Sequence, residues 1–156
     1  MAFLSTKTYG HNIGLSAVFR QPNAHSHCRF LHGYSLGFKF VFGCGELDER
    51  NWVVDFGSLK PLKNWLEKKF DHKLVLAEDD PMMQHFLNLE AAGLCEITRF
   101  QGVGVEWFAY EAWKIAHELV TDASDGRCYC VSAECMEHGA NSAIYTPKEH
   151  AKNEYV

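Results

Sequence analysis

The chain has 156 residues and a formal net charge of −5, and 47% of its residues are hydrophobic. This length fits a single domain spanning residues 1–156, and the apolar fraction excludes a disordered chain, a collagen-like chain and a small disulfide scaffold. No apolar run approaches the ~20 residues of a membrane span, and the N-terminus lacks a signal-peptide pattern, so we expect a cytoplasmic protein away from the membrane. The mild acidity offers no basic stripe for nucleic acid.

Cysteine and histidine are the two residue types that draw attention. The six cysteines include no C-x-x-C pair, so we expect free thiols rather than a zinc ribbon or disulfides. Four of the nine histidines, at positions 11, 25, 27 and 32, fall within a stretch of 22 residues. This crowding makes the first quarter of the chain a candidate for metal or proton chemistry.

The first half of the chain predicts strands followed by a helix. Apolar and alternating segments predict strands over residues 13–20 and 34–43, with the histidine-rich polar loop between them. The segment WVVDF predicts a further short strand, after which a helix is expected to open around Ser58 as its N-cap, with Pro61 in its first turn. An apolar stripe at three- and four-residue steps continues this helix to Asp71 and His72.

The second half predicts a helix over about residues 106–119 and a closing β-hairpin made from CYCVSAECMEH and SAIY. The element order ββααββ indicates an α+β domain, in which a four-stranded antiparallel sheet carries two helices on one face. Residues 79–104 form an insertion between the helices, where MMQHFLNLEAAGL predicts an extra helix and CEITRF an extra short strand.

Three sets of residues could carry chemistry. Cys28 and His32 share the loop CRFLHGY, and an imidazolium near a thiol stabilises the thiolate, although a structural cysteine beside a loop histidine fits equally. Asp71 could orient His72 for proton transfer, or both could be solvated residues of a helix end. Glu134 and Glu137 lie on the last long strand at an odd spacing, so they face opposite sides of the sheet, and one of them could be a buried carboxylate that accepts the paired N–H groups of a guanidine-like heterocycle.

Six segments, in chain order, resemble the motifs of one family. They are LSAVFRQP (15–22) beside F-S-A-A-H-R-L-P, CRFLHGYS (28–35) beside C-x-x-x-H-G-H-S, VDFGSLK (54–60) beside D-F-x-x-L-K, DHK (71–73) beside L-D-H-x-x-L, VGVEWFA (103–109) beside P-T-x-E-N-L-A, and EHGANSAIY (137–145) beside E-T-x-x-x-x-A-x-Y. The chain thus resembles the 6-pyruvoyltetrahydropterin and 6-carboxytetrahydropterin synthases, which have the T-fold. The four-residue step from cysteine to histidine is similar to the bacterial carboxy branch.

The resemblance implies a lyase that converts 7,8-dihydroneopterin triphosphate to 6-carboxy-5,6,7,8-tetrahydropterin on the route to queuosine and other 7-deazapurines. By position, Cys28 would be the general base or acid, Asp71 and His72 the proton relay, and Glu137 the pterin anchor. The family also implies a homo-oligomer, a hexamer of two trimers whose sites are lined by more than one subunit. A pyruvoyl-forming enzyme and a non-catalytic pterin-binding oligomer are the alternatives.

The metal positions depart from the family. Its three zinc-binding histidines correspond here to Phe19, His32 and Tyr34. Zinc could still be held if His27 and His25 join His32, a different or weakly held metal could use the oxygen of Tyr34, or the zinc chemistry could be lost while the pocket remains. His11 would join the site only if the first strand is bent or another subunit contributes it.

Overall fold

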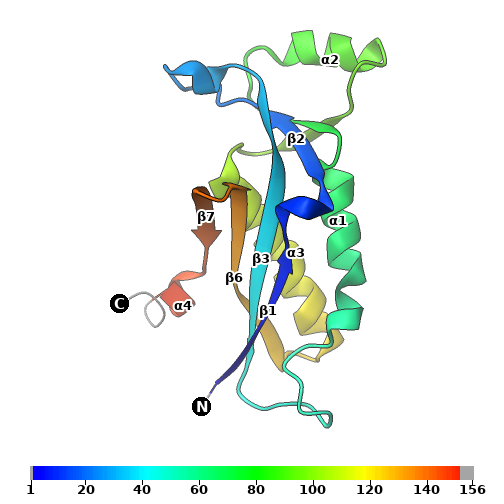
Figure 1. Cartoon of the computed structure of the whole chain (residues 1–156), viewed down its shortest axis with the longest axis vertical. Coiled ribbons are helices and arrows are strands. Elements are labelled where there is room, and N and C mark those ends of the chain that lie inside the picture. Colours follow the sequence, from blue (N-terminus) through cyan, green and yellow to red (C-terminus); the bar gives the residue numbers. More distant parts are fainter. Residues whose placement is uncertain (1, 152–156) are drawn as a thin grey trace.

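One long strand organises the sheet. The computed structural model describes residues 2–151, and its strand β3 (His32–Cys44) runs along the long axis of the molecule (Figure 1). The strand β2 (Leu15–Phe19) pairs antiparallel with the first part of β3, and β1 (Phe3–Tyr9) pairs antiparallel with the rest. The 3₁₀ turn η1 (His11–Ile13) and Gly14, at φ +79°, separate β1 from β2.

The sheet has seven strands among the residues described, rather than the four expected. On the other side of β3 lie β6 (Cys128–His138) and then β7 (Asn141–Tyr145), which confirms the C-terminal hairpin. The strand β4 (Lys73–Ala77) pairs parallel with β2, and β5 (Ile97–Phe100) pairs parallel with β4. The α+β class is confirmed, but the sheet is mixed because β4 and β5 add parallel pairings to it.

Two helices cover one face of this sheet. They are α1 (Lys60–Phe70) and α3 (Val105–Ala123), and Figure 1 shows both on the same side of β3. The insertion contributes α2 (Met83–Ala91) at one end of the molecule, so the extra helix and strand expected there are confirmed. Short elements complete the described chain: η2 (His27–Arg29), η3 (Phe56–Leu59) and α4 (Lys148–Ala151). Between residues 2 and 151, no helix combines the length and apolarity needed to cross a membrane.

The prediction of a strand at WVVDF is wrong. Val53 and Val54 are buried, but the backbone there bends around Asp48, whose carboxylate accepts the N–H groups of Arg50 and Trp52. The expected capping role of Ser58 is also wrong. Asp55 instead accepts the N–H of Gly57 and caps η3, from which α1 continues with Pro61 in its first turn, as expected.

The core is a chain of aromatic contacts between β3 and the two helices. Phe38, Phe40 and Phe42 alternate along β3 and are fully buried. The ring of Phe70, at the end of α1, lies 5.2 Å from the ring of Phe38 and 5.2 Å from that of Phe108 on α3. These aromatic residues therefore pack against the helices rather than face a ligand.

Replacing Phe70 with alanine should lower the free energy of unfolding by about 4 kcal/mol, because the ring is fully buried and its loss leaves a cavity among four aromatic neighbours. Urea unfolding at one fixed protein concentration measures this change. Leu94→Ala, at a side chain 72% exposed, is the control and should change stability by less than about 0.5 kcal/mol. Equal effects would contradict the proposed position of the core.

Candidate active site

A cavity of about 230 Å³ brings several candidate residues together at one end of β2 and β3. Its walls come from four parts of the chain: the end of β2, the loop and strand after it, the start of α3, and the end of β6. The lining residues are Phe19, Arg20, Gln21, Cys28, His32, Val103, Gly104, Val105, Glu106 and Glu137. Cys28, His32 and Glu137, three of the residues singled out in the sequence, therefore meet in one pocket.

Cys28 is the accessible thiol of this chain. It lies in the turn η2, where its N–H donates to the Ser26 hydroxyl (3.3 Å) and its carbonyl accepts the N–H of Gln21 (2.9 Å). Its side chain is exposed, whereas four of the other cysteines are buried and Cys95 is half-buried. Burial raises the pKa of Cys128 to about 11, so such thiols stay protonated and unreactive. All six are free thiols, as expected.

The opposite wall is formed by the start of α3 and by Glu137. Gly104 precedes the helix at φ +117°, a conformation that side chains disfavour, which accounts for a glycine at the position of the family threonine. Glu106 follows in the first turn of α3, and together with Glu137 it gives the pocket two carboxylates. The sequence motifs included Glu106 but gave it no role.

Phe19 and His32 line the pocket, and the Tyr34 ring lies beside both of them. The β2–β3 register places Phe19 opposite His32, and Tyr34 follows two residues later on the same face of β3. The His32 ring is held by a hydrogen bond between Nδ1 and the Phe30 carbonyl (2.7 Å). Burial, and then the charges of Glu137 and Cys28, raise the pKa of the Tyr34 phenol, so it is a neutral hydrogen-bond donor at pH 7.

Asp71 and His72 do not line this pocket within one chain. The Asp71 carboxylate lies 2.8 Å from Nδ1 of His72 and accepts the N–H of Ser16 (3.3 Å), so the pair is hydrogen-bonded beside β2. The His72 side chain is 85% exposed and its backbone has φ +57°. The pair thus has the geometry of a proton relay that faces outward from its own chain.

The histidines of the N-terminal quarter do not gather around a metal. His25 and His27 are exposed in the loop before His32. The chain does break between β1 and β2, which was the condition for His11 to join the site, but the His11 ring lies against the carbonyl of Ser35. Within residues 2–151, no group of three or more His, Cys, Asp or Glu side chains is placed to hold a metal ion. Phe19, His32 and Tyr34 together provide only one imidazole, so they do not fit a three-histidine zinc centre.

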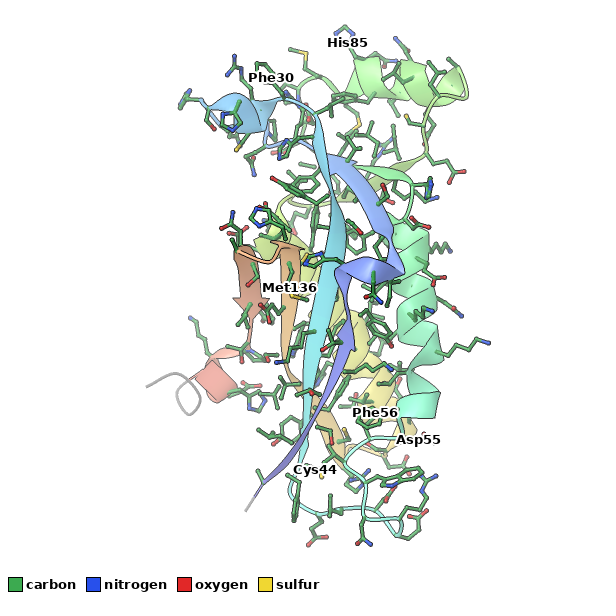
Figure 2. All side chains as sticks on the ribbon, viewed as in Figure 1. Phe30, Cys44, Asp55, Phe56, His85 and Met136 are labelled. Carbon is green, nitrogen blue, oxygen red and sulfur yellow. The ribbon has the colours of Figure 1, made fainter. Side chains whose placement is uncertain are left out.

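A partly buried ion pair fixes the Cys28 loop to the insertion, and sequence reasoning missed it. Arg20 binds Asp80 through two hydrogen bonds (2.8 and 3.0 Å), and it also donates to the carbonyl of Arg29 (2.9 Å). Burial alone would raise the pKa of Asp80, but the bonds from Arg20 and from the N–H of Met82 hold it below its ordinary value. Figure 2 accordingly shows Phe30, on this loop, and His85, on α2, at the same end of the molecule.

Asp80→Asn should destabilise the protein by about 3 kcal/mol, because it leaves the Arg20 charge without its partner. The loss should shrink below about pH 4, since a carboxylate whose pKa is depressed by folding contributes stability only while it is ionised. Urea unfolding at pH 7 and pH 3.5 measures both effects. Glu49→Gln, at a side chain 83% exposed in the Arg50 pair, is the control and should have little effect at either pH. Equal destabilisation by both variants would refute this assignment.

Comparison with known protein families gives a match along most of the chain. The family model of 6-pyruvoyl tetrahydropterin synthase matches residues 10–148. A 6-carboxy-5,6,7,8-tetrahydropterin synthase from Rickettsia conorii is 39% identical over 57 residues, which is 36% of this chain and 41% of that protein. A protein of the same name from Aquifex aeolicus is 30% identical over 69 residues, 44% of this chain and 43% of that protein. The matched stretch therefore covers less than half of these relatives.

Solved structures with the same arrangement share little sequence with this chain. An uncharacterized protein from Wolinella succinogenes superimposes with a TM-score of 0.78 at 16% identity, over 95% of this chain and 99% of that one. A catalytic-residue mutant of 6-pyruvoyltetrahydropterin synthase from Plasmodium vivax gives 0.62 at 12% identity, over 93% and 97%. At such identities the likeness shows a common fold.

Proposed function

Because the chain belongs to the 6-pyruvoyl tetrahydropterin synthase family and has its T-fold, we propose that it is a lyase acting on 7,8-dihydroneopterin triphosphate. The product would be 6-carboxy-5,6,7,8-tetrahydropterin, a precursor of queuosine and other 7-deazapurines. The names of the bacterial relatives and the short step from Cys28 to His32 support the carboxy product over a pyruvoyl one.

The observation that carries this proposal is the meeting of Cys28 and Glu137 in one small cavity. A carboxylate can accept two parallel N–H donors, such as the 2-amino and ring N–H groups of a pterin, so Glu137 would fix the heterocycle. Cys28 would then move a proton at the pterin side chain, where an accessible thiol can reach it. A pocket that only bound a pterin would need Glu137 but no reactive thiol.

We further propose that a neighbouring copy supplies Asp71 and His72 to each pocket. Within one chain this pair does not line the cavity that holds Cys28, and the His72 side chain is exposed. Among the described strands, β1 and β7 each pair along one edge only, which leaves backbone groups free to continue the sheet into another copy. A homohexamer of two trimers would satisfy both features.

A non-catalytic pterin-binding oligomer is the second candidate. It is favoured by Phe19 and Tyr34, which replace two ligands of the metal that the family's chemistry implies. Turnover of 7,8-dihydroneopterin triphosphate by the purified protein separates the two candidates, since the binding protein would leave the triphosphate ester intact.

Glu137→Gln should weaken pterin binding roughly 10- to 100-fold, because an amide cannot accept two N–H donors as a carboxylate does. Titration with neopterin, followed by its fluorescence, measures the change. The matched control is Glu134→Gln, whose carboxylate accepts the Ser142 hydroxyl outside the pocket and should leave binding unchanged. Wild-type affinity in Glu137→Gln would remove its assignment as the anchor.

Subunit mixing tests the shared site. Cys28→Ser and His72→Ala should each be inactive as a homo-oligomer, since each removes one half of every site. After the two variants are dissociated and reassembled together, some interfaces would combine an intact Cys28 with an intact His72, so activity should return. Activity that stays absent after mixing, while size-exclusion chromatography shows mixed oligomers, would place both residues in one chain's site.

A further inference from the structure

Positions 19, 32 and 34 keep the dimensions of a three-histidine metal centre. The ring centroids of Phe19 and His32 are 5.1 Å apart, those of Phe19 and Tyr34 are 5.9 Å apart, and those of His32 and Tyr34 are 5.7 Å apart. Three imidazoles on one zinc, each with a Zn–N bond of about 2.0–2.1 Å, would have ring centres about 5 Å apart. The three rings thus lie at about the mutual spacing that three zinc-bound imidazoles would have.

Two of these three rings offer no imidazole nitrogen. Phe19 is a hydrocarbon, 4% exposed, whose ring meets Phe108 of the core edge-to-face at 5.1 Å. The Tyr34 ring lies between His32 and His138, with centroids 5.7 and 5.9 Å away. Nδ1 of His32 is hydrogen-bonded to the Phe30 carbonyl, so Nε2 of His32 is the single free imidazole nitrogen among these three side chains. A catalytic zinc needs about three protein ligands.

Neighbouring side chains do not replace the missing ligands. His25 and His27 are exposed on the loop, and no three His, Cys, Asp or Glu side chains are grouped to hold a metal ion in residues 2–151. The aromatic rings at the pocket are instead continuous with the core, through Phe19 to Phe108 and on to Phe70. The side chains of Phe19, His32 and Tyr34 thus pack against the core and do not form a metal coordination sphere.

We propose that this pocket binds its pterin without zinc, because Phe19 and Tyr34 convert the family's metal centre into an aromatic wall with one neutral phenol donor. The statement about the pterin rests on the proposed function, whereas the statement about zinc rests on the side chains alone. The flat heterocycle would lie in the cavity against this wall, with its N–H edge on Glu137. The Tyr34 hydroxyl would offer a hydrogen bond in place of a divalent charge.

The test is to rebuild the metal centre. Wild type and the double variant Phe19→His/Tyr34→His are expressed in zinc-supplemented medium, and their zinc content is measured by mass spectrometry. We expect wild type to contain no stoichiometric zinc and the double variant to contain one zinc per chain, with zinc affinity roughly 100-fold tighter or more. Adding His32→Ala to the double variant should abolish this gain, since it removes the third imidazole.

Two results of the zinc measurements would overturn the inference. One zinc per chain in the wild type would do so, and His27→Ala would then show whether the loop supplies a ligand. A folded double variant that gains no zinc would show that the three positions do not form the metal centre. Since Phe19 is buried, Tyr34→His alone serves if the double variant does not fold. It adds one imidazole beside His32 at a half-buried site, and its zinc affinity should still exceed that of the wild type.

Pterin binding is measured separately, by neopterin titration of the wild type with and without a chelator. Equal affinities in the two titrations are expected. Binding that disappears on chelation would overturn the metal-free site. Absence of pterin binding under both conditions, with the zinc result as expected, would refute the proposed function and confine the inference to the loss of zinc.

Discussion

The alternation of side chains along β3 is the constraint on which the rest of the structure depends. Because successive residues point to opposite faces of a strand, one row of β3 carries His32, Tyr34, Phe38, Phe40 and, near its end, Phe42 on the face covered by the helices. The same row builds the core at one end and part of the pocket lining at the other. A one-residue slip in the pairing of β3 would therefore move core and pocket residues together to the wrong face.

Sequence patterns were sufficient for the elements whose partners are near in the chain. The apolar stripe predicted α1, and the closing segments predicted the β6–β7 hairpin, since both depend on local periodicity. The strands β1 and β4 do not stand out in the sequence, because each pairs with a strand that is distant in the chain. The segment at Val53 looked like a strand because its residues are buried, but burial alone does not straighten a backbone.

The candidate site was foreseen only in part. Family motifs, rather than spacing, indicated that Cys28, His32 and Glu137 belong together, and they do share a cavity. The ion pair between Arg20 and Asp80 joins residues 60 positions apart, and each residue alone looks like a solvated charge in the sequence. Motifs also could not tell that Asp71 and His72 do not line the pocket of their own chain, since a motif contains no information about which copy a residue serves.

The Arg20–Asp80 pair also limits which substitutions the chain can accept during evolution. Asp80 lies in the insertion and Arg20 in the lining of the pocket, and the two side chains are joined by their opposite charges. Losing one partner leaves a buried charge that is costly, while losing both together leaves none. Positions 20 and 80 are therefore expected to vary as a pair among descendants of this sequence, and a chain that lost the insertion would need a different residue at position 20.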